Sequence, residues 1–318
     1  MASVVRDELK VFAGNASGVL ADAIAGNLGI TRGKAEVRRF SDGEILIEIK
    51  ENVRGGDVFV VQSTSFPGND HLMELLLMLD AFKRASVKRV TAVIPYYGYA
   101  RQDRKVAPRV PISAKLVADL LVTAGASRVM TMELHAGQIQ GFFNVPVDNL
   151  YAAPVLLPSI TNLVEDLPVA VVSPDAGGVE RARAYAKRLD ASLAIIDKRR
   201  VRANQIEEMR IVGDVSGCAV VLVDDMIDTA GTVCKAADAV MAAGAASVVA
   251  CCTHGVLSGD AVDRVSRSSL SRLITTDTIA PSRAVRDEKK IEVIPVDGLI
   301  AEAIRRTHEE ESISSLFE

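Results

Sequence analysis

The sequence predicts an α/β fold with two tandem domains, each a mostly parallel sheet flanked by helices, and a β-hairpin flag that projects from the sheet. Three observations lead to this prediction. The chain has 318 residues, about twice the length of one ordinary domain. Short apolar runs alternate with longer amphipathic segments, which is typical of parallel βαβ units. A segment in the second half of the chain also resembles one in the first half.

The predicted strands are apolar runs, continuous enough to be covered by helices on both faces. They are Val11–Ala13, Val58–Gln62, Val90–Ile94, Val129–Met132, Val169–Ser173, Leu193–Asp197, Val220–Val223 and Val248–Cys252. Residues 40–49 differ, because Ser41-Asp42-Gly43-Glu44 is turn chemistry between two strand-like pieces. We expect this segment to be the projecting hairpin.

The predicted helices are the amphipathic segments between the strands. They are Ser17–Leu28, His71–Ala85, Ser113–Thr123, Gly178–Leu189, Thr232–Ala243 and Leu299–Arg306. The uncharged stretch from Ala239 to Gly259 is long enough to span a bilayer. Because Gly244 and His254 interrupt it, we read it as a helix, a turn and a strand, and we expect no membrane partner.

The internal similarity joins Ser113–His135 to Thr232–His254, 119 residues later. Each segment contains a helix pattern, the tripeptide Ala-Gly-Ala, an apolar run and a final histidine at the same spacing. Unrelated βαβ units also use Ala-Gly-Ala as turn material, but several side chains match in register, which favours a duplicated domain. We therefore expect one domain over residues 1–149 and a second over residues 150–303.

The composition excludes a general attraction to polyanions. Lys and Arg total 37 against 41 Asp and Glu, so the net charge is −4, and we expect no nucleic-acid partner. Arg6, Asp7 and Glu8 stand where a signal peptide needs an apolar run. The 4 cysteines show no C-x-x-C spacing and are expected to be reduced. These features predict a cytoplasmic protein.

The most informative motif follows the predicted strand Val220–Val223. It consists of Asp224, Asp225, Asp228, Thr229, Ala230, Gly231 and Thr232. Backbone N–H groups in such a turn, together with the next helix N-terminus, form a pocket for one phosphate. The neighbouring acids suit the hydroxyls of a sugar. The alternative is a helix-capping loop with solvated carboxylates, but open α/β sheets bind ligands at this end of their strands.

This motif resembles the phosphoribosyl-diphosphate-binding loop of type I phosphoribosyltransferase folds. Further segments, in order along the chain, are similar to ribose-phosphate diphosphokinases. They are Phe40–Glu44, Tyr96–Lys105, Leu134–Ala136, Ser173–Gly178 and Asp197–Arg200. The resemblance implies two tandem phosphoribosyltransferase-type domains. It also implies an enzyme that transfers the diphosphate group of ATP to the 1-hydroxyl of ribose 5-phosphate, giving 5-phosphoribosyl 1-diphosphate and AMP.

The resemblance implies an ATP site without a Walker A loop. In it Phe40 stacks on adenine and Asp42 and Glu44 contact the base. Arg101 and Gln102 complete this site. Considered alone, a phenylalanine is more often a core residue and a basic run is more often a solvated loop. The basic run directly follows the predicted strand Val90–Ile94, which favours the ATP site.

The same resemblance assigns catalysis and the ribose 5-phosphate site. Lys198 is the main stabiliser of the transition state and Arg200 is its partner, where charge moves onto phosphate oxygens. Ribose 5-phosphate is bound by Arg200, Asp224, Asp225, Asp228, Thr229, Ala230, Gly231 and Thr232. For a charge run considered alone, a solvated surface cluster is the commoner outcome.

Magnesium is the implied cofactor, with His135 and Asp175 as its protein contacts. Without the resemblance, His135 would be read as structural, because Mg²⁺ prefers oxygen ligands over imidazole. Glu133 and Asn144 stand near this region where relatives often have Asp. Such changes can alter the geometry around a metal without removing its ligands.

The resemblance further implies a homohexamer built from dimers, in which the hairpin reaches a neighbour's ATP site. The helix over residues 304–318 is expected to return to the first domain. Residues 312–317 resemble a segment that helps form an ADP regulatory site, so ADP and inorganic phosphate are the expected effectors. Two alternatives stay open. A phosphoribosyltransferase that consumes the product is opposed by the ATP-type segments, and a non-catalytic regulatory relative is opposed by the intact Lys198, Arg200, His135 and Asp175.

Overall fold

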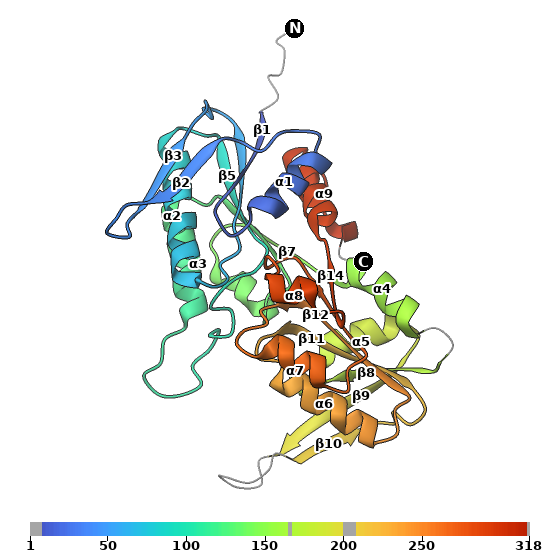
Figure 1. Cartoon of the computed structure of the whole chain (residues 1–318). Helices are drawn as coiled ribbons and strands as arrows, with labels where there is room; N and C mark the ends of the chain where they lie inside the picture. The colour runs from blue at the N-terminus through green and yellow to red at the C-terminus, as the bar shows by residue number, and fades with distance from the viewer. Residues whose placement is uncertain (1–7, 165–166, 200–207, 317–318) are drawn as a thin grey trace. The chain divides into compact units, whose positions relative to one another are not determined.

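The computed structural model describes residues 8–164, 167–199 and 208–316. The chain divides into two compact units. Unit 1 comprises Met1–Tyr151, Thr278–Ala280 and Val296–Glu318, and unit 2 comprises Ala152–Asp277 and Pro281–Pro295. The C-terminal segment therefore belongs to the same unit as the first half of the chain (Figure 1).

Unit 1 contains a parallel sheet. In spatial order its strands are β1 (Leu9–Ala13), β4 (Asp57–Val61), β5 (Arg89–Ile94), β6 (Arg128–Met132) and β7 (Val147–Leu150). The central strands are almost wholly buried, as expected for a sheet that is covered on both faces. The predicted α/β class with parallel sheets is confirmed.

Helices cover both faces of this sheet (Figure 1). They are α1 (Gly18–Asn27), α2 (Gly68–Arg84), α3 (Ser113–Ala124) and α9 (Asp297–His308), with short 3₁₀ turns η1 (Gly137–Phe142) and η2 (Ser314–Leu316). α2 and α3 pack against one face, where the rings of Phe12 and Phe82 lie 4.7 Å apart. α1 and α9 pack against each other beside the other face.

The predicted hairpin is present. β2 (Ala35–Arg39) and β3 (Ile45–Ile49) pair antiparallel, with Arg39 opposite Ile45, and form a separate small sheet. Its apolar side, which includes Val37 and Ile47, packs against the core of unit 1 near α2. The loop of residues 40–44 projects from the unit (Figure 1).

Unit 2 contains a larger, mostly parallel sheet. In spatial order its strands are β10 (Glu208–Val212), β9 (Ser192–Arg199), β8 (Val169–Ser173), β11 (Ala219–Ile227), β12 (Ser247–Gly255), β13 (Arg272–Thr276) and β14 (Ile291–Ile294). β10 pairs antiparallel with β9, and the other pairings are parallel. Its helices are α4 (Ala153–Val164), α5 (Val179–Arg188), α6 (Gly231–Ala242), α7 (Ala261–Arg267) and α8 (Arg283–Asp287).

One predicted strand boundary is wrong in a way that affects the site. We predicted that the strand ends at Val223, whereas β11 continues to Ile227. The extension is stable because Met226 and Ile227 are buried and pair with β12. Asp224 and Asp225 therefore lie within the strand and not after it. Within the described residues, no helix is both long and apolar enough to cross a membrane.

Candidate active site

Outside the hairpin, the predicted site residues that the structure describes follow, or lie at, the carboxyl ends of parallel strands. In unit 1, residues 101–102 come after β5 and His135 comes after β6. In unit 2, Asp175 comes after β8 and residues 224–232 lie at the end of β11. Because parallel strands end at the same edge of a sheet, each unit gathers its residues at one edge, where open α/β sheets bind ligands.

The hairpin loop presents its side chains to solvent. Phe40 is 52% exposed, so it is not a core residue and its ring can stack on a planar ligand. The Phe40 N–H donates to the Glu44 carbonyl at 2.8 Å, and the Asp42 carboxylate accepts from the Glu44 N–H at 3.1 Å. Gly43 has φ +95°, a conformation that glycine adopts without strain. These contacts define the loop that carries Phe40, Asp42 and Glu44.

Thr64 holds the segment that leads to Arg101 and Gln102. Its hydroxyl donates to the Tyr96 carbonyl at 3.2 Å and accepts from the Gly98 N–H at 2.6 Å. The backbones approach so closely that a Cβ at Gly98 would lie 2.4 Å from the Thr64 carbonyl oxygen. Only glycine fits this position, and the turn after β5 is fixed by the end of β4.

Gln102 closes the long loop that follows it. Its side-chain oxygen accepts from the Ser113 hydroxyl at 2.6 Å, and its carbonyl accepts from the Ala114 N–H at 3.2 Å. The two ends of the loop of residues 103–112 therefore meet at the start of α3, and Figure 1 shows the loop projecting from unit 1. Gln102 thus has a structural role besides its predicted contact with ATP.

A tight turn places His135 after β6. Glu133 has φ +45° and is buried, and its N–H donates to the Leu150 carbonyl at 2.7 Å. The next N–H, from Leu134, donates to the Asn149 side chain at 3.0 Å. His135 is exposed, whereas His254, its counterpart in the internal repeat, is buried inside β12. The two matching histidines therefore have different environments.

Asp175 is exposed but fixed in orientation. One carboxylate oxygen accepts from the N–H groups of Gly177 at 2.9 Å and Gly178 at 3.1 Å. The Ser173 hydroxyl donates to the Asp175 carbonyl at 2.6 Å, and a Cβ at Gly178 would lie 2.8 Å from that hydroxyl oxygen. The loop therefore needs its small residues to hold this carboxylate at the start of α5.

The two acids of β11, Asp224 and Asp225, interact with each other. Burial, and then the neighbouring carboxyl of Asp225, raise the pKa of Asp224 from 3.8 to about 8. Arg181 of α5 opposes this shift, because its guanidinium lies 3.9 Å from Asp224 and 3.7 Å from Asp225. The pair can accept hydrogen bonds from hydroxyls, and Arg181 favours the ionised form that does so best.

The short loop after β11 is braced by its neighbours. The Asp228 carboxylate accepts from the Ser258 hydroxyl at 2.5 Å, and Arg264 donates to the Thr229 carbonyl at 2.9 Å. Ala230 is left-handed at φ +59°, and α6 begins at Gly231. The first N–H groups of a helix have no acceptor within the helix and attract anions. The loop therefore presents N–H groups and the Thr229 and Thr232 hydroxyls where a phosphate can bind.

The structure describes only part of the predicted catalytic pair. Lys198 lies in β9, opposite Met209 of β10. It therefore lies within a strand, although we predicted that it follows one. Arg200 lies outside the described residues.

Sequence reasoning missed the polar residues that hold these segments, above all the buried Glu74 and the half-buried Arg181. A signal for Glu74 was present, because it is a charge on the apolar face of the predicted helix His71–Ala85. Arg181 had no such signal. Its contact with the acids joins α5 to β11, and only the fold brings these two elements together.

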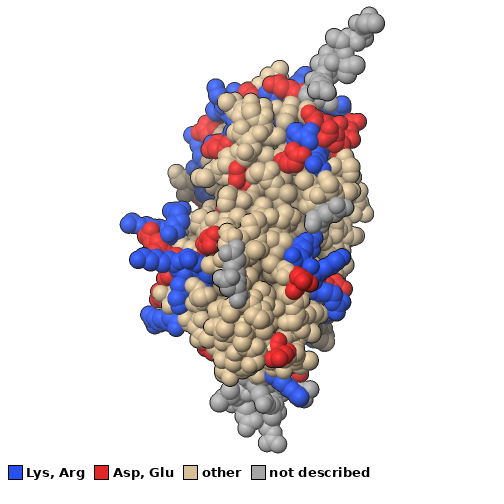
Figure 2. Space-filling view, turned by 90° about the vertical axis from the view of Figure 1, so that its right-hand side faces the viewer, with Lys and Arg blue, Asp and Glu red and all other residues tan. Residues whose placement is uncertain are grey.

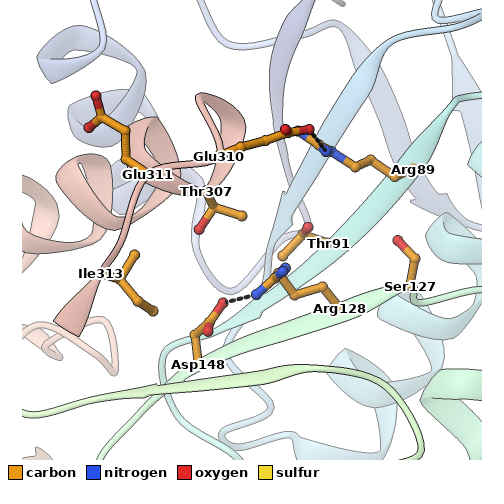
Figure 3. Close-up of a pocket in the computed structure, with 9 residues that line it drawn as sticks. All are labelled: Arg89, Thr91, Ser127, Arg128, Asp148, Thr307, Glu310, Glu311 and Ile313. Atoms are coloured by element: carbon orange, nitrogen blue, oxygen red, sulfur yellow. Dashed lines mark hydrogen bonds and ion pairs between the residues drawn. The ribbon is translucent and has the colours of Figure 1, made fainter.

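A cavity of about 470 Å³ lies away from these segments, within unit 1. Figure 3 shows the residues that line it, which are Arg89, Thr91, Ser127, Arg128, Asp148, Thr307, Glu310, Glu311 and Ile313. Arg89 and Arg128 begin β5 and β6, so the cavity lies toward the amino ends of the strands. Arg128 pairs with Asp148 at 2.7 Å. Figure 2 shows one face of the molecule, on which Lys and Arg side chains lie among Asp and Glu side chains. Positive charge on this face is therefore confined to small groups of residues.

Comparisons with known proteins agree over nearly the whole chain. Residues 9–125 match a family described as the N-terminal domain of ribose phosphate pyrophosphokinase, and residues 199–318 match the phosphoribosyl synthetase-associated domain. Ribose-phosphate pyrophosphokinases of Brucella melitensis and Agrobacterium fabrum are 59% and 58% identical to this chain, over 98% of it and 100% of each relative.

A solved structure gives the same result. The crystal structure of phosphoribosylpyrophosphate synthetase from Mycobacterium smegmatis has a TM-score of 0.91 and 43% identity, and the match covers 96% of this chain and 100% of that one. These findings agree with the resemblance that the site motifs show. They comprise two family matches, relatives that match over nearly the full length of the chain, and a solved structure of the same fold. The chain therefore belongs to the ribose-phosphate pyrophosphokinase family.

Proposed function

We propose that the chain transfers the diphosphate group of ATP to the 1-hydroxyl of ribose 5-phosphate, and releases 5-phosphoribosyl 1-diphosphate and AMP. The observation that carries this proposal is the 59% identity to a ribose-phosphate pyrophosphokinase over 98% of the chain. The position of the site segments at the carboxyl edges of two parallel sheets supports it.

Ribose 5-phosphate binds at the end of β11. The N–H groups and hydroxyls of the loop of residues 228–232 hold the 5-phosphate. Asp224 and Asp225 accept hydrogen bonds from the sugar hydroxyls. Arg181 favours the ionised acids through its contacts of 3.9 and 3.7 Å. Arg200 adds a cation to this site.

ATP binds through the hairpin and the loop after β5. Phe40 stacks on adenine, and its exposed ring supports this role. Asp42 and Glu44 accept hydrogen bonds from the base, while Arg101 and Gln102 complete the site. The guanidinium of Arg101 suits bidentate contact with a phosphate.

The reaction is a displacement at the β-phosphorus of ATP. The 1-hydroxyl oxygen of the sugar forms the new bond to the β-phosphorus and releases its proton to solvent. The bond between the β-phosphorus and the oxygen that it shares with the α-phosphorus breaks, and AMP leaves with that oxygen. Negative charge develops on the bridging and equatorial phosphate oxygens. Lys198 stabilises this charge with Arg200 as its partner, because cations aimed at developing charge lower the barrier.

Magnesium is the proposed cofactor, with Asp175 and His135 as its protein contacts. Asp175 fits a hard cation, because its carboxylate is exposed and held in place by two backbone N–H groups. His135 is exposed and offers an imidazole nitrogen. When bound, Mg²⁺ neutralises charge on the phosphates of ATP. Within the described residues, no three acids, histidines or cysteines gather into a metal-binding group.

The proposed functional form is a homohexamer in the cytoplasm, with ADP and inorganic phosphate as its effectors. The similarity to family members over 98% of the chain supports this oligomeric state, location and regulation.

Phosphorus NMR tests the activity directly. The purified protein is mixed with ribose 5-phosphate, MgATP and inorganic phosphate, and products are followed over time. Equal appearance of AMP and 5-phosphoribosyl 1-diphosphate is the expected result. Formation of ADP with a singly phosphorylated product would indicate ordinary kinase chemistry. Absence of turnover would favour a regulatory relative.

A further inference from the structure

We propose that Asn15, Arg39, Asp70 and Glu74 form a hairpin anchor that positions the tip of the β2–β3 hairpin, residues 40–44. The anchor thereby sets the affinity for ATP and the preference for adenine. The inference rests on the proposed contacts between this tip and the base. The four residues act as positioning residues, because they work through the tip and not on the nucleotide.

Glu74 is the fixed point of the anchor. It is only 2% exposed, and a buried carboxylate is costly unless donors satisfy it. Its Oε1 accepts from the Asn15 side chain at 2.8 Å. Its Oε2 accepts from the Asn15 N–H at 3.2 Å and from the Gln62 side chain at 2.8 Å. The carboxylate of Glu74, on α2, is therefore held by residues that follow the ends of β1 and β4.

Arg39 connects this fixed point to the hairpin. It is the last residue of β2 and directly precedes Phe40. Its Nη2 lies 3.1 Å from the Asp70 carboxylate and 4.0 Å from Glu74 Oε1. The Asn15 side chain also donates to the Val37 carbonyl of β2 at 3.5 Å. Two carboxylates of α2 and one amide therefore hold the end of the strand that carries the tip.

The neighbouring Arg38 provides a matched comparison. It has the same charge and is exposed, but its guanidinium pairs with Glu36 of the same strand at 3.2 Å. Its ion pair therefore lies within the hairpin and does not connect the hairpin to α2. The base of the hairpin is fixed independently, because Ile47 and Ile49 pack against the core. Loss of the Arg39 contacts should therefore let the tip change its angle without unfolding the hairpin.

Steady-state kinetics of the full-length enzyme test the anchor. Arg39→Gln and Asp70→Asn are each expected to raise KM for ATP roughly threefold to fivefold, the size expected for a partly exposed ion pair. Turnover and KM for ribose 5-phosphate should stay within about twofold, since the tip touches only the base. The preference for ATP over GTP should fall by a similar factor. Arg38→Gln should change none of these quantities.

The double variant and a conservative variant distinguish positioning from direct contact. Arg39→Gln combined with Asp70→Asn should be no worse than Arg39→Gln alone, because that change already removes the contact with Asp70. Arg39→Lys should restore most of the ATP affinity. If Arg39→Gln raises KM for ATP but Asp70→Asn does not, Arg39 contacts the nucleotide itself and the inference is overturned.

Phe40→Ala separates failure of the inference from failure of the proposed ATP site. If it raises KM for ATP while both anchor variants behave like the parent enzyme, the tip contacts ATP but the anchor does not position it. If it leaves KM for ATP unchanged, the tip does not contact the base. In that case the proposed ATP site and the anchor both fail.

Discussion

Asp57 and His308, which lie 251 positions apart, are joined by a hydrogen bond of 2.7 Å between Oδ2 of the carboxylate and Nδ1 of the imidazole. Asp57 is fully buried at the start of β4, and the same oxygen accepts from Arg89 Nη2 at 2.6 Å. His308 is the last residue of α9. The carboxylate therefore ties the end of the C-terminal helix to the amino edge of the sheet in unit 1.

Asp57→Ala should lower the free energy of unfolding by about 3–5 kcal/mol, because it removes the buried partner of Arg89 and His308. Urea unfolding measures this loss. Glu310→Gln is the control, since Glu310 is 81% exposed and lies 3.8 Å from Arg89, and such a pair contributes less than about 1 kcal/mol. A loss below about 1 kcal/mol for Asp57→Ala would contradict the role of this carboxylate.

Gly98→Ala should weaken ATP binding and lower the melting temperature. The added Cβ would lie 2.4 Å from the Thr64 carbonyl, and such overpacking costs about 1–3 kcal/mol and shifts the backbone that leads to Arg101. KM for ATP and thermal unfolding are the measurements. Gly26→Ala in α1, where no atom lies within 4 Å of the new Cβ, should leave KM unchanged and slightly raise stability. If the two variants have the same KM for ATP and the same melting temperature, the close approach of Gly98 to Thr64 has no effect on ATP binding or stability.

Asp224→Asn should bind ribose 5-phosphate at least about tenfold more weakly above pH 8, where the parent carboxyl is ionised and the variant lacks a charged acceptor, yet be more stable than the parent at pH 8. The pKa of Asp224 is raised from 3.8 to about 8. The folded protein therefore keeps a proton that the unfolded chain releases, and the free energy of unfolding falls as pH rises from about 4 to about 8. The amide cannot ionise and escapes this loss.

Melting temperatures of this variant and the parent at pH 5 and pH 8 test the sign. The difference should be larger at pH 8, by about 2–4 °C for each 1 kcal/mol. Asp190→Asn, at an exposed position with φ +48° that asparagine tolerates, should show no such change. A difference that is larger at pH 5 would refute the linkage.

Lys198→Ala should lower kcat by about 10²–10³ with little change in either KM, because a cation that acts on developing phosphate charge contributes mainly in the transition state. Arg200→Ala should lower kcat and also raise KM for ribose 5-phosphate. Single-turnover assays with radiolabelled ATP measure both effects. Lys187→Ala, on α5, is the control and should retain full turnover. Full turnover by Lys198→Ala would remove it from the mechanism.

Six helices were predictable because their apolar faces repeat locally, whereas α4, α7 and α8 were not predicted. The predicted Ser113–Thr123 differs from the observed helix by one residue at its C-terminal end, and the predicted Thr232–Ala243 differs by one residue at each end. The ends of the strands were harder to predict from the sequence. β11 continues past two acids because β12 pairs with it, and local composition contains no such information. The strands β7, β10, β13 and β14 were not predicted, since their short runs mix apolar and polar residues.

The location of the candidate site was predictable where a motif is contiguous, because residues 224–232 lie at the end of β11 and the start of α6, whereas their contacts with ligands stay a prediction. It was not predictable where function depends on pairs from distant segments. The contacts of Arg181 with the acids of β11, of Thr64 with Gly98, and of Arg39 with Asp70 each need the fold to bring them together. The sequence therefore indicates which contiguous segments lie at the candidate site, but not which residues from distant segments hold them in place.

The return of the C-terminal segment to unit 1 determines the order in which the protein is completed during synthesis. A ribosome releases α9 only after every strand of unit 2 has been made, because α9 follows β14 in the chain. Unit 2 can therefore finish folding while the face of unit 1 beside α1 is still uncovered. The unit that is synthesised first is thus completed last, and until then it exposes apolar surface that chaperones bind.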